Sequence, residues 1–383
     1  MTEIVKVKAP RAQRAKRTLE NLLQKAGIEI NGSCPWDIQI HNENFYNRVL
    51  SQGSLGLGES YMDGWWDCES IDEFINKILT SDIRKTLLIT PGLVLNFIVA
   101  RIINQQTKRK AKEVIDVHYD LGNDLYERML DSRMVYTCAY WKDAKNLDEA
   151  QEAKLDLVCK KLQLKPGMRI LDIGCGFGSF LKFAHEKYGV TGVGITLSKE
   201  QLDYAEKSCS GLPLEFRLQD YRDVNERFDA IVSIGMFEAV GYKNFNKYME
   251  VVKRCLPPNG LFLLHTIGSN RPLSQMNNPW INKYIFPNGA LPTISSIGKS
   301  VGNRFVMEDW HNFGTDYDKT LMAWDENFTK RWPELSSKYG KRFYRMWIYY
   351  LRSCAGSFRA RNIQLWQIVL SKGGIKGGYQ SVR

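Results

Sequence analysis

The chain has 383 residues, of which 44% are hydrophobic and 25% charged, and this mixture excludes a disordered protein. At roughly 100–200 residues per domain, the length predicts two domains. Lys and Arg exceed Asp and Glu by 53 − 42 = 11, and the excess is concentrated in the first twenty residues, in 101–112 and in 331–383. Such segments attract nucleic acid or an anionic membrane surface, or they are simply solvated.

The eight cysteines have no CxxC spacing, which argues against a zinc ribbon and a disulfide scaffold. The basic N-terminus lacks the apolar run of a secretory signal. The most apolar stretch, Leu87–Ile103, is interrupted by Pro91 and Gly92 and is too short to cross a bilayer, which takes about 18 uninterrupted residues. We therefore expect a cytoplasmic protein with reduced thiols.

Residues 1–95 are predicted to form a small, mainly helical N-terminal domain. Helical spacing covers 11–26, and a short helix over 71–79 follows Ser70, a candidate N-cap that would complete a capping box with Glu73. Between them lies a glycine-rich segment that ends in Trp65 and Trp66. Residues 96–116 are polar and basic, as in a linker, and 117–383 form the second domain.

The second domain alternates strands with helices. We expect strands at 170–173, 190–196, 214–218, 228–234 and 261–267, and helices at 147–162, 179–188, 199–207 and 245–255. This alternation predicts an α/β fold with a parallel sheet covered on both faces. Residues 268–301, rich in Pro, Asn and Ser, are predicted to lie over the carboxyl edge of the sheet, where open α/β folds bind ligands.

A glycine-rich segment, Asp172–Gly178, follows a predicted strand and opens a predicted helix. Its glycines allow a tight turn and close approach of a ligand, so it suits either a dinucleotide or S-adenosylmethionine (AdoMet). The next strand ends at Thr196 without the acid that a dinucleotide site uses for ribose hydroxyls. Either Gln201 or the Thr196–Ser198 turn would replace that contact. With Gln219–Tyr221 ending the third strand near a bound adenine, the order resembles class I AdoMet-dependent methyltransferases with a Rossmann-like domain.

Further segments resemble the cyclopropane-fatty-acyl-phospholipid synthases. The resemblance covers about residues 51–370, and Thr137 departs from the commoner serine of the second segment. The segments are His118–Tyr126, Tyr136–Trp141, Gly235–Gly241, His265–Gly268, Pro279–Pro287, Glu308–Gly314 and Cys354–Arg359.

The resemblance implies transfer of the AdoMet methyl carbon to the cis double bond of an unsaturated phospholipid acyl chain, with a bound bicarbonate as general base. It also implies an N-terminal domain that helps to hold the lipid, a homodimer, and peripheral association with the inner face of the membrane. Bicarbonate would be bound by Cys138, Glu238, His265, Ile267 and Tyr317. The catalytic positions would be Cys138, Glu238, His265, Tyr317 and Cys354. AdoMet would be held by Tyr136, Thr137, Asp172, Gly174, Cys175, Gly176, Thr196, Leu197, Ser198, Gln201, Gln219, Asp220 and Tyr221.

The chemistry agrees with these residue types. An alkene is a weak nucleophile, so it needs a sulfonium donor and alignment in a dry site. Attack leaves positive charge on the acyl carbons, which aromatic faces stabilise; the candidates are Tyr136, Tyr140, Trp141, Phe237 and Tyr317. Ring closure then needs a base. Because no covalent enzyme step is needed, we expect Cys354 to have a packing role near the lipid pocket.

The segment 343–366 interleaves aromatics with Arg345, Arg352, Arg359 and Arg361, and Arg342 lies just before it. It either contacts lipid headgroups or forms a helix packed on the sheet, with its arginines paired to acids. Likewise Tyr61, Trp65 and Trp66 either anchor to lipid or fill the N-terminal core. We expect phospholipid and an anionic membrane, rather than nucleic acid, as partners. The rival functions are methyl transfer to a lipid headgroup or RNA base, and membrane scaffolding with a degenerate site.

Overall fold

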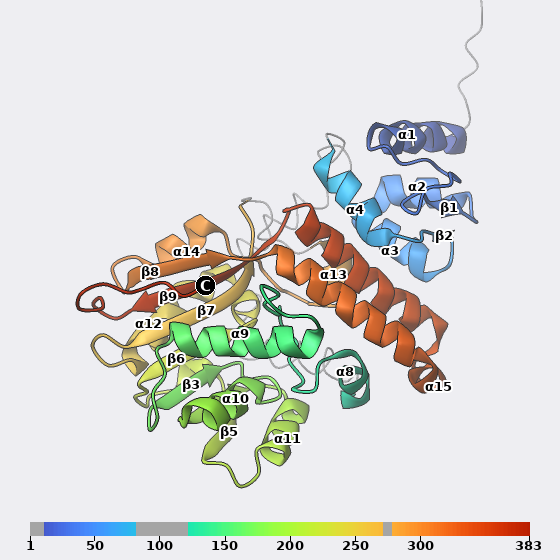
Figure 1. Cartoon of the computed structure of the whole chain (residues 1–383). Helices are drawn as coiled ribbons and strands as arrows, with labels where there is room; N and C mark the ends of the chain where they lie inside the picture. The colour runs from blue at the N-terminus through green and yellow to red at the C-terminus, as the bar shows by residue number, and fades with distance from the viewer. Residues whose placement is uncertain (1–10, 82–121, 271–277) are drawn as a thin grey trace, which may run out of the picture.

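A computed structural model describes residues 11–81, 122–270 and 278–383 (Figure 1). It has an α/β domain and a smaller, mainly helical N-terminal domain, with a long C-terminal helical hairpin between them. The predicted linker, the apolar stretch Leu87–Ile103 and the first residues of the segment that begins at His118 lie outside the described residues. Within the described ranges, no helix is both long and apolar enough to cross a membrane.

The N-terminal domain contains helices α1 (Arg11–Lys25), α2 (Asn44–Gln52), α3 (Ser54–Met62) and α4 (Ile71–Thr80), and an antiparallel pair β1 (Gln39–Ile40) and β2 (Trp66–Asp67). Tyr61 and Trp66 are buried in its core, so these two aromatics do not serve as lipid anchors. The capping box predicted at Ser70 is wrong. The Ser70 side chain makes no cap hydrogen bond, and the Glu73 carboxylate instead accepts hydrogen bonds from Asn76 and Arg359.

The α/β domain is built on a seven-stranded sheet in the order β5-β4-β3-β6-β7-β9-β8. The five strands β5 to β7 are parallel, as predicted, but β9 runs antiparallel to both of its neighbours. The sequence interpretation missed β8 and β9. The strands are β3 (Arg169–Ile173), β4 (Thr191–Thr196), β5 (Leu214–Leu218), β6 (Ala230–Ile234), β7 (Leu261–Gly268), β8 (Val306–Asn312) and β9 (Gln364–Ser371).

Helices cover both faces of this sheet because its strands are apolar on both sides. On one face, α9 (Leu147–Lys161), α10 (Ser179–Tyr188) and α11 (Lys199–Ser208) pack on a core that includes Ile170 and Val232. On the other, α12 (Phe245–Cys255) and α14 (Ile294–Val301) pack on Leu171 and Ile173. Alternate residues of β3 thus face opposite layers, which places Asp172 on the side of α9.

Helix α15 (Thr315–Arg359) folds back on itself at Gly340, whose φ of 69° and ψ of 165° interrupt the helix. Its arms lie between the two domains (Figure 1) and share one apolar core with the N-terminal helices and α8 (Asn123–Met129). Two ion pairs join this helix to the N-terminal domain, Arg342 with Asp63 and Arg345 with Asp67. Two more join its arms to each other, Arg352 with Asp325 and Arg359 with Asp318.

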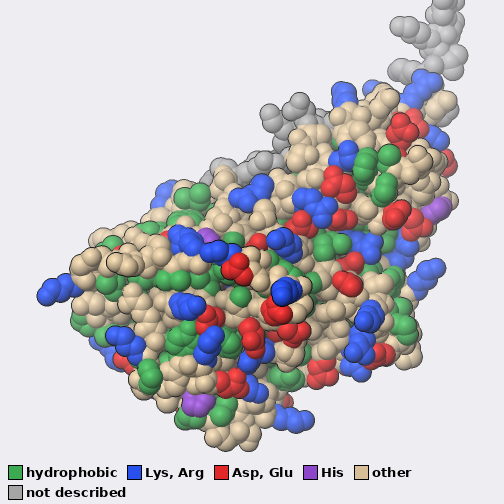
Figure 2. Space-filling model, in the orientation of Figure 1, with side chains coloured by type: hydrophobic (Ala, Val, Ile, Leu, Met, Phe, Trp, Pro, Cys, Tyr) green, Lys and Arg blue, Asp and Glu red, His purple; other side chains and the backbone are tan. Residues whose placement is uncertain are grey.

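These ion pairs favour arginines paired to acids over headgroup contact, but the helix packs mainly on the N-terminal helices and α8, and not on the sheet as expected. Of the four arginines in this segment and Arg342 just before it, all but Arg361 are engaged with carboxylates inside the molecule, and the side chain of Arg345 is only 14% exposed. On the face seen in Figure 2, Lys and Arg side chains are interspersed with Asp and Glu and do not gather into one basic patch. Attraction to a membrane would therefore come from charges other than these four arginines.

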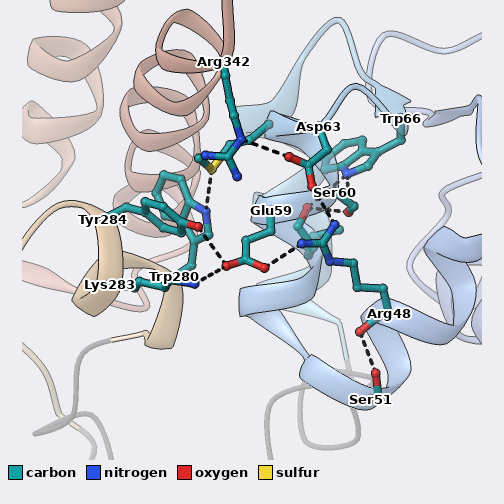
Figure 3. A network of polar contacts seen from close by, with 12 residues as sticks. Arg48, Ser51, Glu59, Ser60, Asp63, Trp66, Trp280, Lys283, Tyr284 and Arg342 are labelled. Carbon is teal, nitrogen blue, oxygen red and sulfur yellow. Dashed lines mark hydrogen bonds and ion pairs between the residues drawn. The ribbon is translucent and has the colours of Figure 1, made fainter.

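Glu59 of α3 is the centre of a polar network between the domains (Figure 3). Its carboxylate accepts hydrogen bonds from Arg48 within the N-terminal domain and from Lys283 and Tyr284 of α13 (Pro279–Tyr284), at 2.6, 2.7 and 2.8 Å. Beside it, the Trp280 indole packs so closely on Gly58 that a Cβ there would lie 2.4 Å from the ring. These donors hold the pKa of Glu59 at about 2 despite its burial.

Glu59→Gln should reduce the free energy of unfolding by about 1–3 kcal/mol, because a buried charge-assisted network loses its acceptor. The folded-state pKa lies below the ordinary 4.5, so this contribution is complete above about pH 4.5 and is lost as pH falls towards 2. Urea unfolding at pH 7 and pH 3 measures both effects. Glu43→Gln, an exposed partner of Lys16, is the control and should change stability by less than about 0.5 kcal/mol. Equal losses for the two variants would contradict the argument.

Candidate active site

A cavity of about 340 Å³ lies at the carboxyl edge of the parallel strands, where the sequence predicted ligand binding. Residues at the ends of β3, β4 and β6 form one side of it. Phe286–Gly289 and Leu291, from the segment that follows α13, form another. The wall of the cavity is mostly apolar. The volume of the cavity lies in the range of small-molecule sites. All thirteen residues predicted to hold AdoMet border this cavity.

The glycine-rich loop turns from β3 into α10 with left-handed backbone at three positions. Gly174, Gly176 and Gly178 have φ of 84°, 54° and 82°, which L-residues with a Cβ rarely adopt. A Cβ on Gly174 would lie 2.6 Å from the Met236 Cβ. In contrast, the described chain has no atom within 4 Å of a Cβ on Gly176. The loop therefore leaves space for a ligand beside Gly176.

Asp172, immediately before the loop, is 2% exposed. Within the described residues its Oδ1 has no hydrogen-bond partner. Burial raises the pKa of this carboxyl to about 7, while the charge of Lys154 acts to lower it. Asp172 thus offers an unused acceptor next to the loop, as expected for a residue that binds the donor or braces the loop.

The turn after β4 is held by its own hydroxyls. Ser198 caps α11 by accepting from the Gln201 N–H at 3.3 Å. The Thr196 hydroxyl donates to Gln201 Oε1 at 2.9 Å and accepts from the Ser198 N–H at 3.1 Å. Because these side chains also border the cavity, the turn and Gln201 together occupy the place expected of a ribose-binding acid.

Asp220 is less available to a ligand than the sequence suggested. It precedes a one-turn 3-10 helix (Tyr221–Asp223) and accepts from the Arg222 N–H at 2.9 Å. Its carboxylate also forms a bidentate pair with the Arg222 guanidinium, at 2.7 and 2.6 Å. Arg222 itself borders the cavity and was not predicted. The pair fixes the orientation of both side chains, and the Asp220 carboxylate neutralises the Arg222 charge at this end of the site.

Three of the five residues assigned to bicarbonate, Glu238, Ile267 and Tyr317, border the cavity. Glu238 lies beyond the end of β6, in a one-turn 3-10 helix, Phe237–Ala239. Its Oε1 accepts from the Ile267 N–H at 2.6 Å, so this amide is already engaged. Its Oε2 has no partner in the described parts of the chain. Burial raises the pKa of Glu238 to about 7.

The other two, Cys138 and His265, are buried but do not border the cavity. Gln367 Nε2 lies 3.3 Å from His265 Nδ1. An amide nitrogen only donates, so Nδ1 accepts and Nε2 carries the proton. Nε2 finds no partner among the described residues, and burial lowers the pKa of this imidazole, which keeps it neutral. The Cys138 thiol donates to the Ala139 carbonyl at 3.2 Å, and burial raises its pKa.

The aromatic side chains that border the cavity include three tyrosines next to its Glu238 side, Tyr136, Tyr317 and Tyr350, besides Phe177, Phe180, Tyr221 and Phe286. The hydroxyls of Tyr136 and Tyr350 lie 2.9 Å apart, and Tyr317 stacks on Phe358. Phe237 is wrong as a cavity aromatic because its ring is fully buried and stacks on Phe245 at 4.2 Å. Tyr140 and Trp141 also lie outside the cavity wall.

Cys354 does not border the cavity, although it packs against the apolar core that α15 shares with the N-terminal domain. Burial raises the pKa of its thiol to about 12. It is therefore protonated at neutral pH, unlike an activated nucleophile. These observations agree with the packing role expected for Cys354.

The cavity residues that the sequence interpretation did not assign to the site include Lys154, Arg222, Phe286 and Tyr350. Of these, Lys154 could have been identified from the sequence pattern of its helix. Leu147, Gln151, Lys154 and Val158 follow one another at helical spacing of four, three and four residues, and all four are buried. A lysine on the inward stripe of a helix needs a partner, because an unpaired buried charge is costly.

A family model described as mycolic acid cyclopropane synthetase matches residues 105–368. A cyclopropane-fatty-acyl-phospholipid synthase from Escherichia coli (strain K12) is 55% identical over 368 residues, 96% of each chain. Cyclopropane mycolic acid synthase 2 from Mycobacterium leprae is 35% identical over 288 residues, which cover 68% of this chain and 94% of that one. The structure of the cyclopropane synthase MmaA2 from Mycobacterium tuberculosis matches 68% of this chain and 98% of its own, with 33% identity and a TM-score of 0.64.

Proposed function

Because this chain belongs to the mycolic acid cyclopropane synthetase family and is an AdoMet-dependent transferase, we propose that it acts on phospholipids. The reaction is transfer of a methylene from AdoMet to the cis double bond of an unsaturated acyl chain, which yields a cyclopropane ring and S-adenosylhomocysteine. The observation that carries this proposal is the unpartnered Glu238 carboxylate oxygen at the wall of a mostly apolar cavity that begins at the glycine-rich loop.

AdoMet is proposed to lie along the loop and the ends of β4 and β5, with its sulfonium directed towards Glu238 and Tyr317. Asp172, the Thr196–Ser198 turn and Gln201 supply polar groups for its amino-acid and ribose parts. The acyl chain would occupy the apolar part of the cavity. A dry wall suits the reaction, because water would trap the positive charge that forms on the acyl carbons.

The phenol rings of Tyr136, Tyr317 and Tyr350 are proposed to stabilise that charge through their faces, an effect of about 2 kcal/mol where water is excluded. Burial raises the pKa of Tyr317 and Tyr350, so both stay neutral. A neutral phenol does not trap a carbocation as a phenolate would. The three rings thus favour ring closure over side reactions.

The described residues fit a small anion that can both accept a hydrogen bond and donate one through its own OH group. Glu238 Oε2 can accept a hydrogen bond and His265 Nε2 can donate one, and both atoms lack partners within the described chain. We propose that Cys138, Glu238, His265, Ile267 and Tyr317 would hold bicarbonate there, although the Ile267 N–H already donates to Glu238. Bound there, bicarbonate would supply the base for the proton lost on ring closure.

We further propose that the protein works as a homodimer at the cytoplasmic face of the membrane and is attracted to anionic lipid by its net charge of +11. Because the arginines of α15 are largely paired internally, the attraction is expected to depend on the remaining basic residues. It should weaken as salt is added, since exposed charges are screened.

The decisive experiment incubates the protein with AdoMet and anionic vesicles of monounsaturated phospholipid and then examines the lipid by mass spectrometry. We expect the mass of one CH2 to be added to the acyl chain, and vesicles of saturated lipid to remain unchanged. A gain on the headgroup would indicate headgroup methylation instead. No gain on any lipid would contradict the proposed reaction. Repeating the assay at higher salt tests the membrane proposal separately.

A further inference from the structure

Lys154 is a buried cation at the wall of the cavity. It lies on α9 with its side chain fully buried, and its Nζ donates to the Thr137 hydroxyl at 2.7 Å. The Thr137 carbonyl accepts from Gln151 at 2.8 Å, so this residue is held to α9 at two points. Neither the assigned anion-binding residues nor the assigned donor-binding residues include Lys154.

Lys154 shares its layer of the domain with Asp172. The alternation along β3 turns Asp172 towards α9, and both residues border the same cavity. The Asp172 Oδ1 lacks a partner within the described residues, so this oxygen is available to accept a hydrogen bond from a ligand. A carboxylate in this position needs a nearby positive charge to stay ionised.

We propose that Lys154 is a further residue of the AdoMet site proposed above, on which this inference rests. Its ammonium group orients the Thr137 hydroxyl and keeps Asp172 in the carboxylate form that accepts hydrogen bonds from the donor. Lys154 is thus a positioning residue that acts on the ligand through Thr137 and Asp172.

The other titratable groups around Lys154 and Asp172 either accept hydrogen bonds from the backbone or are uncharged. Asp131, which also acts on Lys154, accepts hydrogen bonds from the backbone N–H groups of Arg133 and Val135. Cys138 is a protonated thiol and His265 a neutral imidazole, since burial moves each pKa away from the charged form.

Around Asp172 itself, Cys175 and Tyr248 are neutral too, because burial raises both pKa values. Burial lowers the pKa of Lys154 to about 8, so the ammonium form prevails at pH 7. Lys154 is therefore the cation that opposes the effect of burial on Asp172.

Calorimetric titration with S-adenosylhomocysteine tests the inference without depending on turnover. Lys154→Met keeps the length of the side chain but removes its charge, and we expect it to weaken binding about 10- to 100-fold near pH 7. Lys161→Met is the matched control. Lys161 is on the same helix and equally buried, but its Nζ faces His311 at 3.0 Å and Asp309 at 3.6 Å, away from the cavity. The control should bind within about threefold of the unmodified protein.

The pH dependence separates this role from a merely structural one. In the unmodified protein, affinity should rise through about pH 7 as Asp172 ionises. In Lys154→Met the midpoint should move to higher pH, so the deficit shrinks by about pH 8.5. Asp172→Asn should abolish the pH dependence, and adding Lys154→Met to it should cost less than about threefold.

An unshifted midpoint and near-normal affinity in folded Lys154→Met would overturn the inference. If that variant does not fold, Lys154→Arg decides the matter: its permanent charge should place the midpoint at or below that of the unmodified protein, and a higher midpoint would overturn the inference. Failure of the unmodified protein to bind S-adenosylhomocysteine would instead overturn the proposed AdoMet site itself.

Discussion

Glu238→Gln is expected to lower kcat by about 100- to 10,000-fold while S-adenosylhomocysteine still binds. Glutamine has nearly the same shape and its amide oxygen can still accept from the Ile267 N–H. It cannot act as a carboxylate through the oxygen that has no partner in the described chain. Proton removal at ring closure should therefore fail, whereas donor binding along the glycine-rich loop should not. His265→Ala should give a similar loss, since its Nε2 is a donor without a partner in the described chain and is proposed to hold the same anion.

The pH profile distinguishes loss of this carboxylate from general damage. Burial places the pKa of Glu238 at about 7, so activity at constant bicarbonate should rise as pH increases through that value. This limb should be absent in Glu238→Gln. Tyr248→Phe is the control: the Tyr248 hydroxyl is equally buried and unpartnered within the described residues but does not border the cavity. Near-normal turnover in both Glu238→Gln and His265→Ala would show that this region does not hold the base.

The parallel part of the sheet could be predicted because its strands are short apolar runs, and residues typical of turns precede β3 and β7. Pro166-Gly167 precedes β3, and Pro257–Gly260 precedes β7. β8 was missed because its sequence, from Val306 to Asn312, carries two acids and a histidine, as an exposed edge strand can. β9 was missed because it is apolar on both faces and follows a helix without a proline or a strong turn signal, so periodicity alone does not separate strand from helix.

The donor-binding residues could be located because they follow the ends of parallel strands, which meet at one edge. Contacts set by tertiary packing could not. Phe237 is next to Glu238 in sequence, but its ring turns into the layer of α12 and stacks on Phe245. Similarly, Asp220 occupies the predicted place, yet Arg222, two residues on, uses its carboxylate. The sequence thus predicts which end of the sheet a residue lies at, whereas tertiary packing determines what its side chain contacts.

Gly174→Ala is the second substitution expected to have a large effect. It should weaken S-adenosylhomocysteine binding by at least about 30-fold and reduce the free energy of unfolding by about 1–3 kcal/mol. The backbone at Gly174 has φ of 84°, and a Cβ would lie 2.6 Å from the Met236 Cβ. Relief of this overlap requires the backbone of the loop or that of Met236 to move, because the overlapping atom is a Cβ and not the end of a flexible side chain. Such a movement shifts the neighbouring Asp172 carboxylate and the space beside Gly176, where the donor is proposed to lie.

Gly211→Ala separates backbone strain from damage to the site. Gly211 has a similar φ of 80°, but the described chain has no atom within 4 Å of a Cβ there, and the residue does not border the cavity. The control should therefore lose about 1–2 kcal/mol of stability from strain alone and bind S-adenosylhomocysteine normally. Calorimetry and urea unfolding on the two variants measure both quantities. If Gly174→Ala bound the ligand as tightly as Gly211→Ala, the loop would not form the donor site, because strain of the same kind would have left binding intact.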